Sequence, residues 1–159
     1  MPDPGAVPRS NANDLFYLEL RYDQLLSGVD GTAQRDGNIA QVIWRTRGRE
    51  RQAYSATYDY LSRMKVASYY DLTDAGAASS DQKFREEVTY ADLRGNIKTL
   101  QRNGLYADGA AWKVGQIDKL TYTTTSGTNK LASVSDSEVV RPRSKTCTIS
   151  SKFLVAPSP

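Results

Sequence analysis

Alternation of aromatic and polar residues between positions 54 and 60 constrains the fold more than any other feature of this chain. The aromatic and apolar residues fall at every second position: Tyr54, Ala56, Tyr58 and Tyr60. The residues between them are polar: Ser55, Thr57 and Asp59. Successive side chains of a β-strand point to opposite faces, whereas a helix would scatter these positions around its axis. The segment therefore predicts a strand with one tyrosine-rich face.

Two further segments have the composition of strands. Residues 39–44 (IAQVIW) are apolar and β-branched, and residues 120–125 (LTYTTT) combine threonine with tyrosine. Residues 71–87 are expected to form a long loop that leads into a strand near Val88. Short sequences that favour tight turns separate the strands: Asp30-Gly31, Asp36-Gly37-Asn38, Gly95-Asn96, Asn103-Gly104, Asp108-Gly109 and Ser126-Gly127. The pattern predicts an all-β chain of consecutive antiparallel hairpins.

The composition suits one domain and excludes several classes of function. The chain has 159 residues and 39% hydrophobic content, which is enough for a core. It has no histidine for catalysis or metal binding, and its single cysteine, Cys147, cannot form an internal disulfide. No stretch is long and apolar enough to span a membrane, and the first twenty residues lack the pattern of a signal peptide. The net charge of +3 does not demand a polyanionic partner.

Strands, turns and apolar residues recur in one order. An apolar residue that we call the anchor follows each of four turns: Ile39, Met64, Ile97 and Leu131. Three of the anchors have a tyrosine upstream, near the end of a strand: Tyr58, Tyr90 and Tyr122. A single hairpin cannot bury its apolar face, but stacked hairpins can form a continuous sheet. The order therefore predicts an internal repeat.

These repeats resemble the YD-repeat (Rhs) proteins, in the repeat-associated core region of large bacterial exported or surface proteins. The resemblance rests on LRYD at 20–23, LSGVDG at 26–31, GNI at 37–39 leading to Trp44, AY at 53–54, TYDYLSRM at 57–64, GNIKTLQRNG at 95–104, LTY at 120–122 and NKL at 129–131. It covers residues 15–136. Residues 1–14 are interpreted as a flexible lead-in, and residues 137–159 as an irregular tail outside the family.

The resemblance implies a curved strip of hairpins that is part of a hollow shell, with other YD-repeat segments and an enclosed toxin domain as partners. It also implies an extracellular or envelope location and a scaffolding role without catalysis. The sequence departs from the family pattern at Tyr90-Ala91-Asp92, which has an inserted residue, and at Tyr122, which threonine follows. The positions expected to define the structural repeat are Ile39, Trp44, Tyr58, Asp59, Met64, Tyr90, Gly95, Asn96, Ile97, Tyr122 and Leu131.

A group of alternating arginines offers a different hypothesis. Arg45, Arg47, Arg49 and Arg51 would form one cationic face on an unbroken strand and could bind the phosphates of a nucleic acid. Trp44 could then stack on a base. Gly48 interrupts the series, however, and favours a solvated turn with Trp44 in the core. Nucleic acid is therefore the less favoured partner.

The remaining candidates for chemistry are weak. Asp59, Asp92 and Asp118 are assigned to turns or strand ends, where aspartate usually bonds its own backbone. No catalytic residue, metal ligand or cofactor site is expected, and the chain is not expected to be an enzyme. A cell-surface carbohydrate- or protein-binding module with exposed tyrosines is the main alternative to a structural role.

Overall fold

The chain forms one antiparallel sheet of nine strands in the computed structural model, which describes residues 14–73, 78–80 and 82–137. No helix occurs among these residues. The strands are β1 (Phe16–Arg21), β2 (Gln41–Thr46), β3 (Arg51–Tyr58), β4 (Met64–Leu72), β5 (Ala78–Ser79), β6 (Glu86–Tyr90), β7 (Ile97–Asp108), β8 (Ala111–Thr124) and β9 (Leu131–Asp136).

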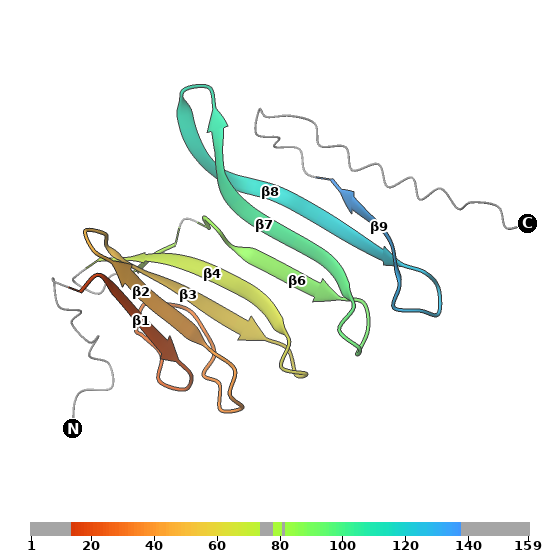
Figure 1. Cartoon of the computed structure of the whole chain (residues 1–159), viewed down its shortest axis with the longest axis horizontal. Coiled ribbons are helices and arrows are strands. Elements are labelled where there is room, and N and C mark those ends of the chain that lie inside the picture. The colour runs from red at the N-terminus through yellow and green to blue at the C-terminus, as the bar shows by residue number, and fades with distance from the viewer. Residues whose placement is uncertain (1–13, 74–77, 81, 138–159) are drawn as a thin grey trace, which may run out of the picture.

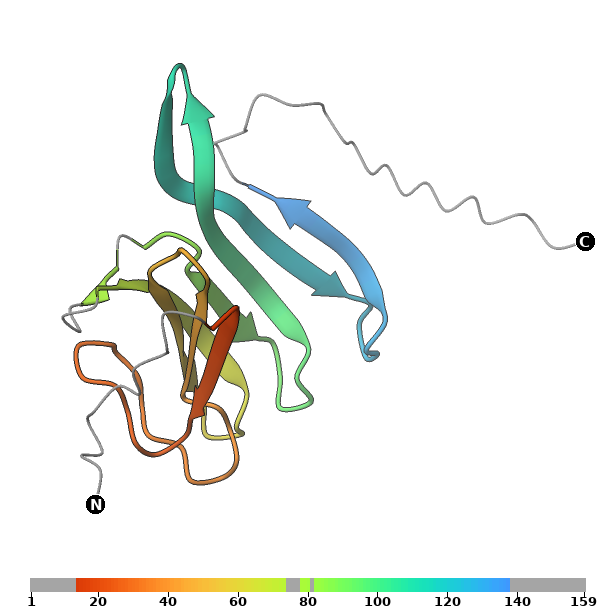
Figure 2. The ribbon, with the colours of Figure 1, turned by 60° about the vertical axis from the view of Figure 1, so that its left-hand side comes forward.

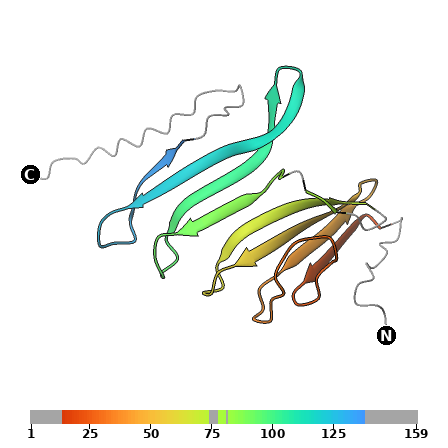
Figure 3. The same ribbon diagram turned by 180° about the vertical axis from the view of Figure 1, so that it is seen from behind.

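Strands that are consecutive in the sequence lie side by side, in the order β1-β2-β3-β4-β6-β7-β8-β9, and β5 pairs with β4. The result is a curved, open strip of hairpins (Figure 1; Figure 3). The all-β prediction and the predicted strip of antiparallel hairpins are therefore confirmed. All strands lie within 15–136. Apart from Asp14 and Ser137, the predicted lead-in and tail lie outside the described residues.

The buried core lies at the β1–β4 end of the strip, where the β1–β2 loop covers one face of the sheet (Figure 2). Leu26 and Val29 from this loop pack on side chains of β2, β3 and β4: Ile43, Ala53, Tyr70 and Leu72. We call this covered side of the sheet the inner face. The opposite side, which carries Trp44, Tyr54 and Tyr69, is the outer face.

Hydrogen bonds hold the β1–β2 loop on the inner face. Gln41 is buried, its side-chain oxygen accepts from the Leu26 amide at 2.7 Å, and its side-chain nitrogen donates to the Val29 carbonyl at 3.1 Å. The Tyr70 hydroxyl donates to the Asp30 carboxylate at 2.9 Å. These bonds satisfy polar groups that would otherwise be costly to bury.

Three expectations about local structure are wrong. Tyr60 does not extend the tyrosine face of β3, because the strand ends at Tyr58 and Tyr60 lies in the following turn with 81% of its side chain exposed. Asn103-Gly104 is not a turn but lies inside β7. Asp118 lies inside β8, opposite Arg102, with which it forms an ion pair.

The β7–β8 hairpin extends beyond its neighbours as an arm (Figure 1). Its register shifts between Arg102 and Asn103, where β8 contributes one extra residue, and such a bulge bends and twists a ribbon. Gly104 and Gly115 lie opposite each other beyond the bulge. A Cβ atom on Gly104 would lie 2.6 Å from Cδ1 of Ile117, so any larger residue here would require the Ile117 side chain to shift.

Candidate functional site: the turns at one end of the sheet

Four connections meet at one end of the sheet, at the lower edge in Figure 1, because alternate turns of consecutive hairpins emerge on the same side. They are the end of the β1–β2 loop with Asp36, and the β3–β4, β6–β7 and β8–β9 turns. Each precedes one of the four anchors. The predicted repeats are therefore neighbours in space.

The β3–β4 turn is held by the carboxylate of Asp59. One oxygen accepts from the backbone amides of Leu61 and Arg63 at 2.9 and 3.0 Å, and the other accepts from Nε of Arg63 at 2.8 Å. The Arg63 side chain and these amides lower the pKa of Asp59. Asp59 is thus a turn-forming residue that is charged at neutral pH.

Asp92 plays the same part in the β6–β7 turn. One oxygen accepts from the amides of Arg94 and Asn96 at 3.0 and 3.3 Å, and the other from the Asn96 side chain at 2.8 Å. The Asn96 side chain and the turn amides lower the pKa of Asp92. Gly95 has a φ of +91°, which glycine adopts without strain. The carboxylate-held turn therefore forms at Asp92, where Ala91 separates it from Tyr90, as it does at Asp59, which directly follows Tyr58.

A register shift marks the end of the strand before three of the four connections. It falls at Thr57/Tyr58 in β3, at Thr89/Tyr90 in β6 and at Thr123/Thr124 in β8. The residue after the shift pairs with the anchor, so Tyr58 pairs with Met64 and Tyr90 with Ile97. In the fourth unit Thr124 pairs with Leu131. Tyr122, the tyrosine upstream of this anchor, lies near the end of β8 and pairs with Val134.

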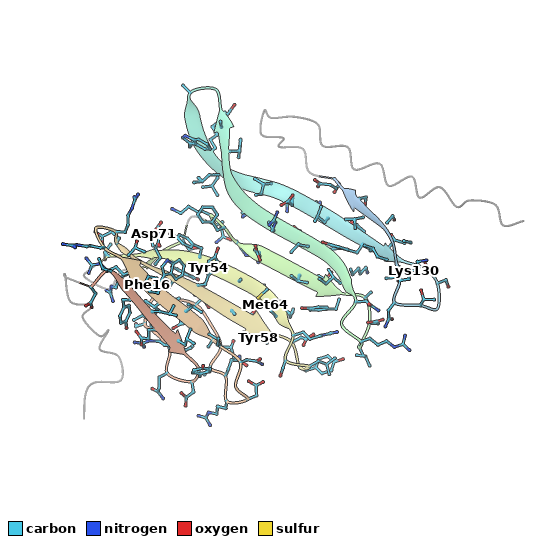
Figure 4. The ribbon with its side chains drawn as sticks, viewed as in Figure 1. Phe16, Tyr54, Tyr58, Met64, Asp71 and Lys130 are labelled. Carbon is cyan, nitrogen blue, oxygen red and sulfur yellow. The ribbon has the colours of Figure 1, made fainter. Side chains whose placement is uncertain are left out.

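Two of the repeat tyrosines bind the preceding unit. The Tyr58 hydroxyl donates to the carbonyl of Ile39, and the Tyr90 hydroxyl donates to the carbonyl of Met64, both at 2.8 Å. In each case the acceptor is the anchor of the previous repeat. Tyr58 and Met64 lie near the same end of neighbouring strands (Figure 4). The tyrosines thus connect consecutive units as well as packing within them.

Polar side chains also link each turn to the next. Ser62 donates to the Asp36 carboxylate at 2.7 Å, Arg63 donates to the Asp92 carbonyl at 2.6 Å, and Asn96 donates to the Asn129 side chain at 3.0 Å. The Arg63 guanidinium also lies 4.2 Å from the centre of the Tyr90 ring. Hydrogen bonds from Ser62 and Asn38 lower the pKa of Asp36. A continuous chain of contacts therefore runs across all four turns.

The apolar anchors bury less surface than expected. Ile39 and Met64 are half-buried, but Ile97 is 38% exposed and Leu131 is 54% exposed. The sequence predicts packing at Ile97 and Leu131, but the core cluster of the described residues lies at the β1–β4 end and includes neither of them. At these two positions the anchor begins a strand and does not fill a core.

Trp44 belongs to an aromatic row on the outer face. Its ring stacks on Tyr54 with centroids 5.7 Å apart, Tyr54 meets Tyr69 at 5.6 Å, and Tyr69 meets Phe84 at 5.4 Å. Cross-strand aromatic pairs of this kind stabilise a sheet. Trp44 is half-buried in this row and lies outside the loop-covered core.

The four arginines do not share a face. Gly48 adopts a φ of +75° and the amide of Arg49 donates to Thr46, so Arg47 and Arg49 lie in the β2–β3 turn. Arg45 donates to the Arg49 carbonyl at 3.0 Å. Arg51 is buried and donates to the Thr73 carbonyl at 3.3 Å. The unbroken cationic strand on which the nucleic-acid hypothesis rests is absent from this segment.

Arg63 is a residue of these turns that the predicted site residues do not include. Arg63 contacts Asp59, Tyr90 and Asp92 together. The signal in the sequence that could have identified Arg63 is its spacing of four residues from Asp59.

The described residues contain no group of three acidic or cysteine side chains suited to a metal ion, and no helix in this part of the chain has the length and hydropathy to cross a membrane. Comparisons with protein-family models, curated proteins and solved structures find no match to this chain.

Proposed function

We propose that the chain is a non-catalytic structural segment of a YD-repeat shell, which scaffolds or encloses a toxin or effector domain of a larger exported protein. One observation carries the proposal, namely that each repeat tyrosine at positions 58 and 90 bonds to the anchor of the preceding unit. A unit that binds its predecessor in a fixed way can be added again and again. Repetition of this kind produces an extended wall.

The turns support the same role. Asp59 and Asp92 direct their carboxylates at their own turn amides and at adjacent side chains of the turns. Side chains engaged in this way stabilise a wall and are not free to act as acids or bases. Scaffolding explains both the repeated carboxylates and their low pKa values.

The alternatives receive less support. A binding module that works through exposed tyrosines needs free aromatic faces and hydroxyls. Five tyrosine hydroxyls instead donate hydrogen bonds within the chain, to acceptors in strands or in the loops beside them: those of Tyr54, Tyr58, Tyr69, Tyr70 and Tyr90. A nucleic-acid interface needs several cations on one face, whereas Arg51 is buried and Arg47 and Arg49 lie in a turn. An extracellular or envelope location follows from the proposed family.

Sequencing of the genomic DNA on both sides of the coding sequence tests the proposal. We expect adjoining sequence to encode further units in the order strand, tyrosine, carboxylate-held turn and apolar anchor. Flanks without any such unit on either side would contradict a place in a larger shell. Detection of the chain by antibody in the culture medium or envelope fraction tests the location separately, and an exclusively cytosolic signal would contradict it.

A further inference from the structure

The edge strand β1 has an unusual surface for an outer strand. Phe16, Leu18 and Leu20 point to the outer face and are 57%, 53% and 42% exposed. Proteins usually protect a free sheet edge with lysine, proline or a bulge, because an open apolar edge pairs readily with another strand. β1 has none of these features. Its two charged residues, Glu19 and Arg21, already bind each other at 2.7 Å.

The backbone of β1 is also available along its outer edge. The carbonyls of Leu15 and Arg21 accept hydrogen bonds from Arg47 and Ala40, on the β2 side. Backbone groups alternate in direction along an antiparallel strand, so the even-numbered residues Phe16, Leu18 and Leu20 direct theirs away from β2. The residues with exposed apolar side chains are therefore those with outward backbone groups.

We propose that β1 pairs with β1 of a second copy of this chain, antiparallel and about a two-fold axis at Leu18. In this register Leu18 faces Leu18 of the second copy, and Phe16 faces its Leu20. Tyr17 faces its Glu19 on the inner face. Each chain then contributes apolar pairs on the outer face, and the contact is isologous and closes as a dimer. On the inner face the Tyr17 hydroxyl already donates to Glu19 of its own chain at 2.5 Å.

Neighbouring registers are unfavourable. A shift of one residue in each chain toward the C-terminus places Glu19 opposite Glu19, and like charges directly opposite destabilise a strand pair. The opposite shift places Leu20 against Asp14. A register that mixes odd and even residues would place outer-face side chains on the inner face. The sequence of β1 therefore matches itself in one register.

The β1–β2 loop bonds to this strand only at its end, where the Gln34 amide donates to the Tyr22 carbonyl at 2.8 Å, and it leaves the side chains of Phe16, Leu18 and Leu20 exposed. Its buried residues Leu26 and Val29 pack on β2, β3 and β4. Phe16 lies on β1, the first strand of the sheet (Figure 4). The other edge strand, β9, is a poorer candidate because Ser133, Ser135 and Asp136 line it. The second copy thus meets an edge with which no other strand of the described residues pairs.

Light scattering on the full chain after size exclusion tests this proposal. We expect a mass of twice 17.6 kDa that falls toward the monomer on dilution. Leu18→Lys places two ammonium groups at the two-fold axis, so it should give a monomer at concentrations where the wild type is dimeric. The matched control is Val134→Lys on β9, which is 44% exposed and should leave the dimer intact.

Mixing variants tests the register. Leu18→Glu alone should also be monomeric, whereas an equal mixture of Leu18→Lys and Leu18→Glu should recover the dimer. Circular dichroism establishes that each variant is folded. Slower amide exchange of Leu18 and Leu20 with rising wild-type concentration gives a measurement that needs no variant. A wild-type monomer at all concentrations, loss of the dimer by Val134→Lys alone, or failure of the mixture to pair would each overturn the proposal.

Discussion

A single hydroxyl group connects one repeat to the next. Tyr90 reaches across to the carbonyl of Met64, and Tyr58 makes the same bond to Ile39. A half-buried backbone carbonyl that loses a donor retains part of its desolvation cost. The contribution of these tyrosines to stability is therefore greater than that of tyrosines whose hydroxyls face solvent.

Tyr90→Phe isolates this contribution. Removal of the hydroxyl should lower the free energy of unfolding by about 1 kcal/mol, the usual worth of one hydrogen bond. Urea unfolding measured by circular dichroism gives the value. Tyr60→Phe is the matched control, because Tyr60 is the most exposed tyrosine of the described region and should leave the stability unchanged. Equal effects of the two substitutions would contradict a role for the tyrosine-to-anchor bond.

Arg63→Ala tests the link between the second and third turns. The substitution removes the bond to Asp59, the bond to the Asp92 carbonyl and the contact with the Tyr90 ring at once. We expect a lower urea midpoint and faster amide exchange in both turns. Arg94→Ala is the control, because Arg94 hydrogen-bonds to Asp92 through its backbone amide, which alanine retains, and its side chain adds only a charge interaction with that carboxylate. Exchange that rises only in the β3–β4 turn would show that Arg63 does not couple the two.

The turns act as elements whose stability depends on ionised carboxylates. Asp36, Asp59 and Asp92 have folded-state pKa values below the ordinary value of 3.8, because hydrogen bonds favour their charged forms. The native state therefore binds protons less readily than the unfolded chain. The stabilisation is complete above about pH 4 and is lost as the pH falls through the folded-state pKa values.

Acid titration of stability checks this dependence. The urea midpoint should fall steadily below about pH 4, and the fall should be smaller in an Asp59→Asn, Asp92→Asn double variant, which is less stable at neutral pH. Glu50→Gln is a suitable control, because this carboxylate lies outside the turns that carry the repeat. A double variant with the acid dependence of the wild type would assign the effect to other carboxylates.

The β7–β8 arm depends on glycines at its bend. Gly104→Ala places a methyl group 2.6 Å from the Ile117 side chain, and such overpacking typically costs about 1–3 kcal/mol. We expect that loss in urea unfolding, with chemical-shift changes centred on the bulge at Arg102 and Asn103. Gly109→Asn is the control, since nothing lies within 4 Å of a Cβ there and asparagine tolerates its φ of +64°. A neutral Gly104→Ala would show that the arm readily repacks.

Sequence patterns predicted the elements better than their exact ends. Alternation identified β3, and the anchors identified the starts of β4, β7 and β9, because period two and turn chemistry are local properties. Asn103-Gly104 misled the prediction, since glycine serves a close approach between strands as well as a turn. Tyr122 lies near the end of β8 as predicted, but the residue that pairs with the anchor Leu131 is Thr124, because the register depends on the partner strand. The links between Arg63, Tyr90 and Asp92 join residues distant in sequence, so no local pattern could reveal them.

At the scale of the whole molecule, stability is concentrated where the loop covers the sheet. Leu26→Ala should lower the free energy of unfolding by about 2–4 kcal/mol, because Leu26 is 4% exposed and its loss leaves a cavity against Ile43 and Leu72. Leu131→Ala should change it by less than about 0.5 kcal/mol, because that side chain is largely exposed. Thermal or urea unfolding distinguishes the two. A larger effect at Leu131 would place the core elsewhere.

The same asymmetry predicts a gradient of local opening along the strip. β2 and β3 have neighbours on both edges and a loop on one face, whereas β9 has a single neighbour in the described structure and all of its side chains are exposed. Opening of β9 therefore exposes little apolar surface and breaks hydrogen bonds to one strand only. Native-state hydrogen exchange should show the strongest protection for Ile43 and Ala53, less in β7, and least in Ser133 and Val134. Because the repeats interact with nearest neighbours, protection should fall stepwise from unit to unit. Uniform protection across all strands would instead require that the sheet open as one cooperative unit, with the turn links at Arg63 and Asn96 strong enough to join its two halves.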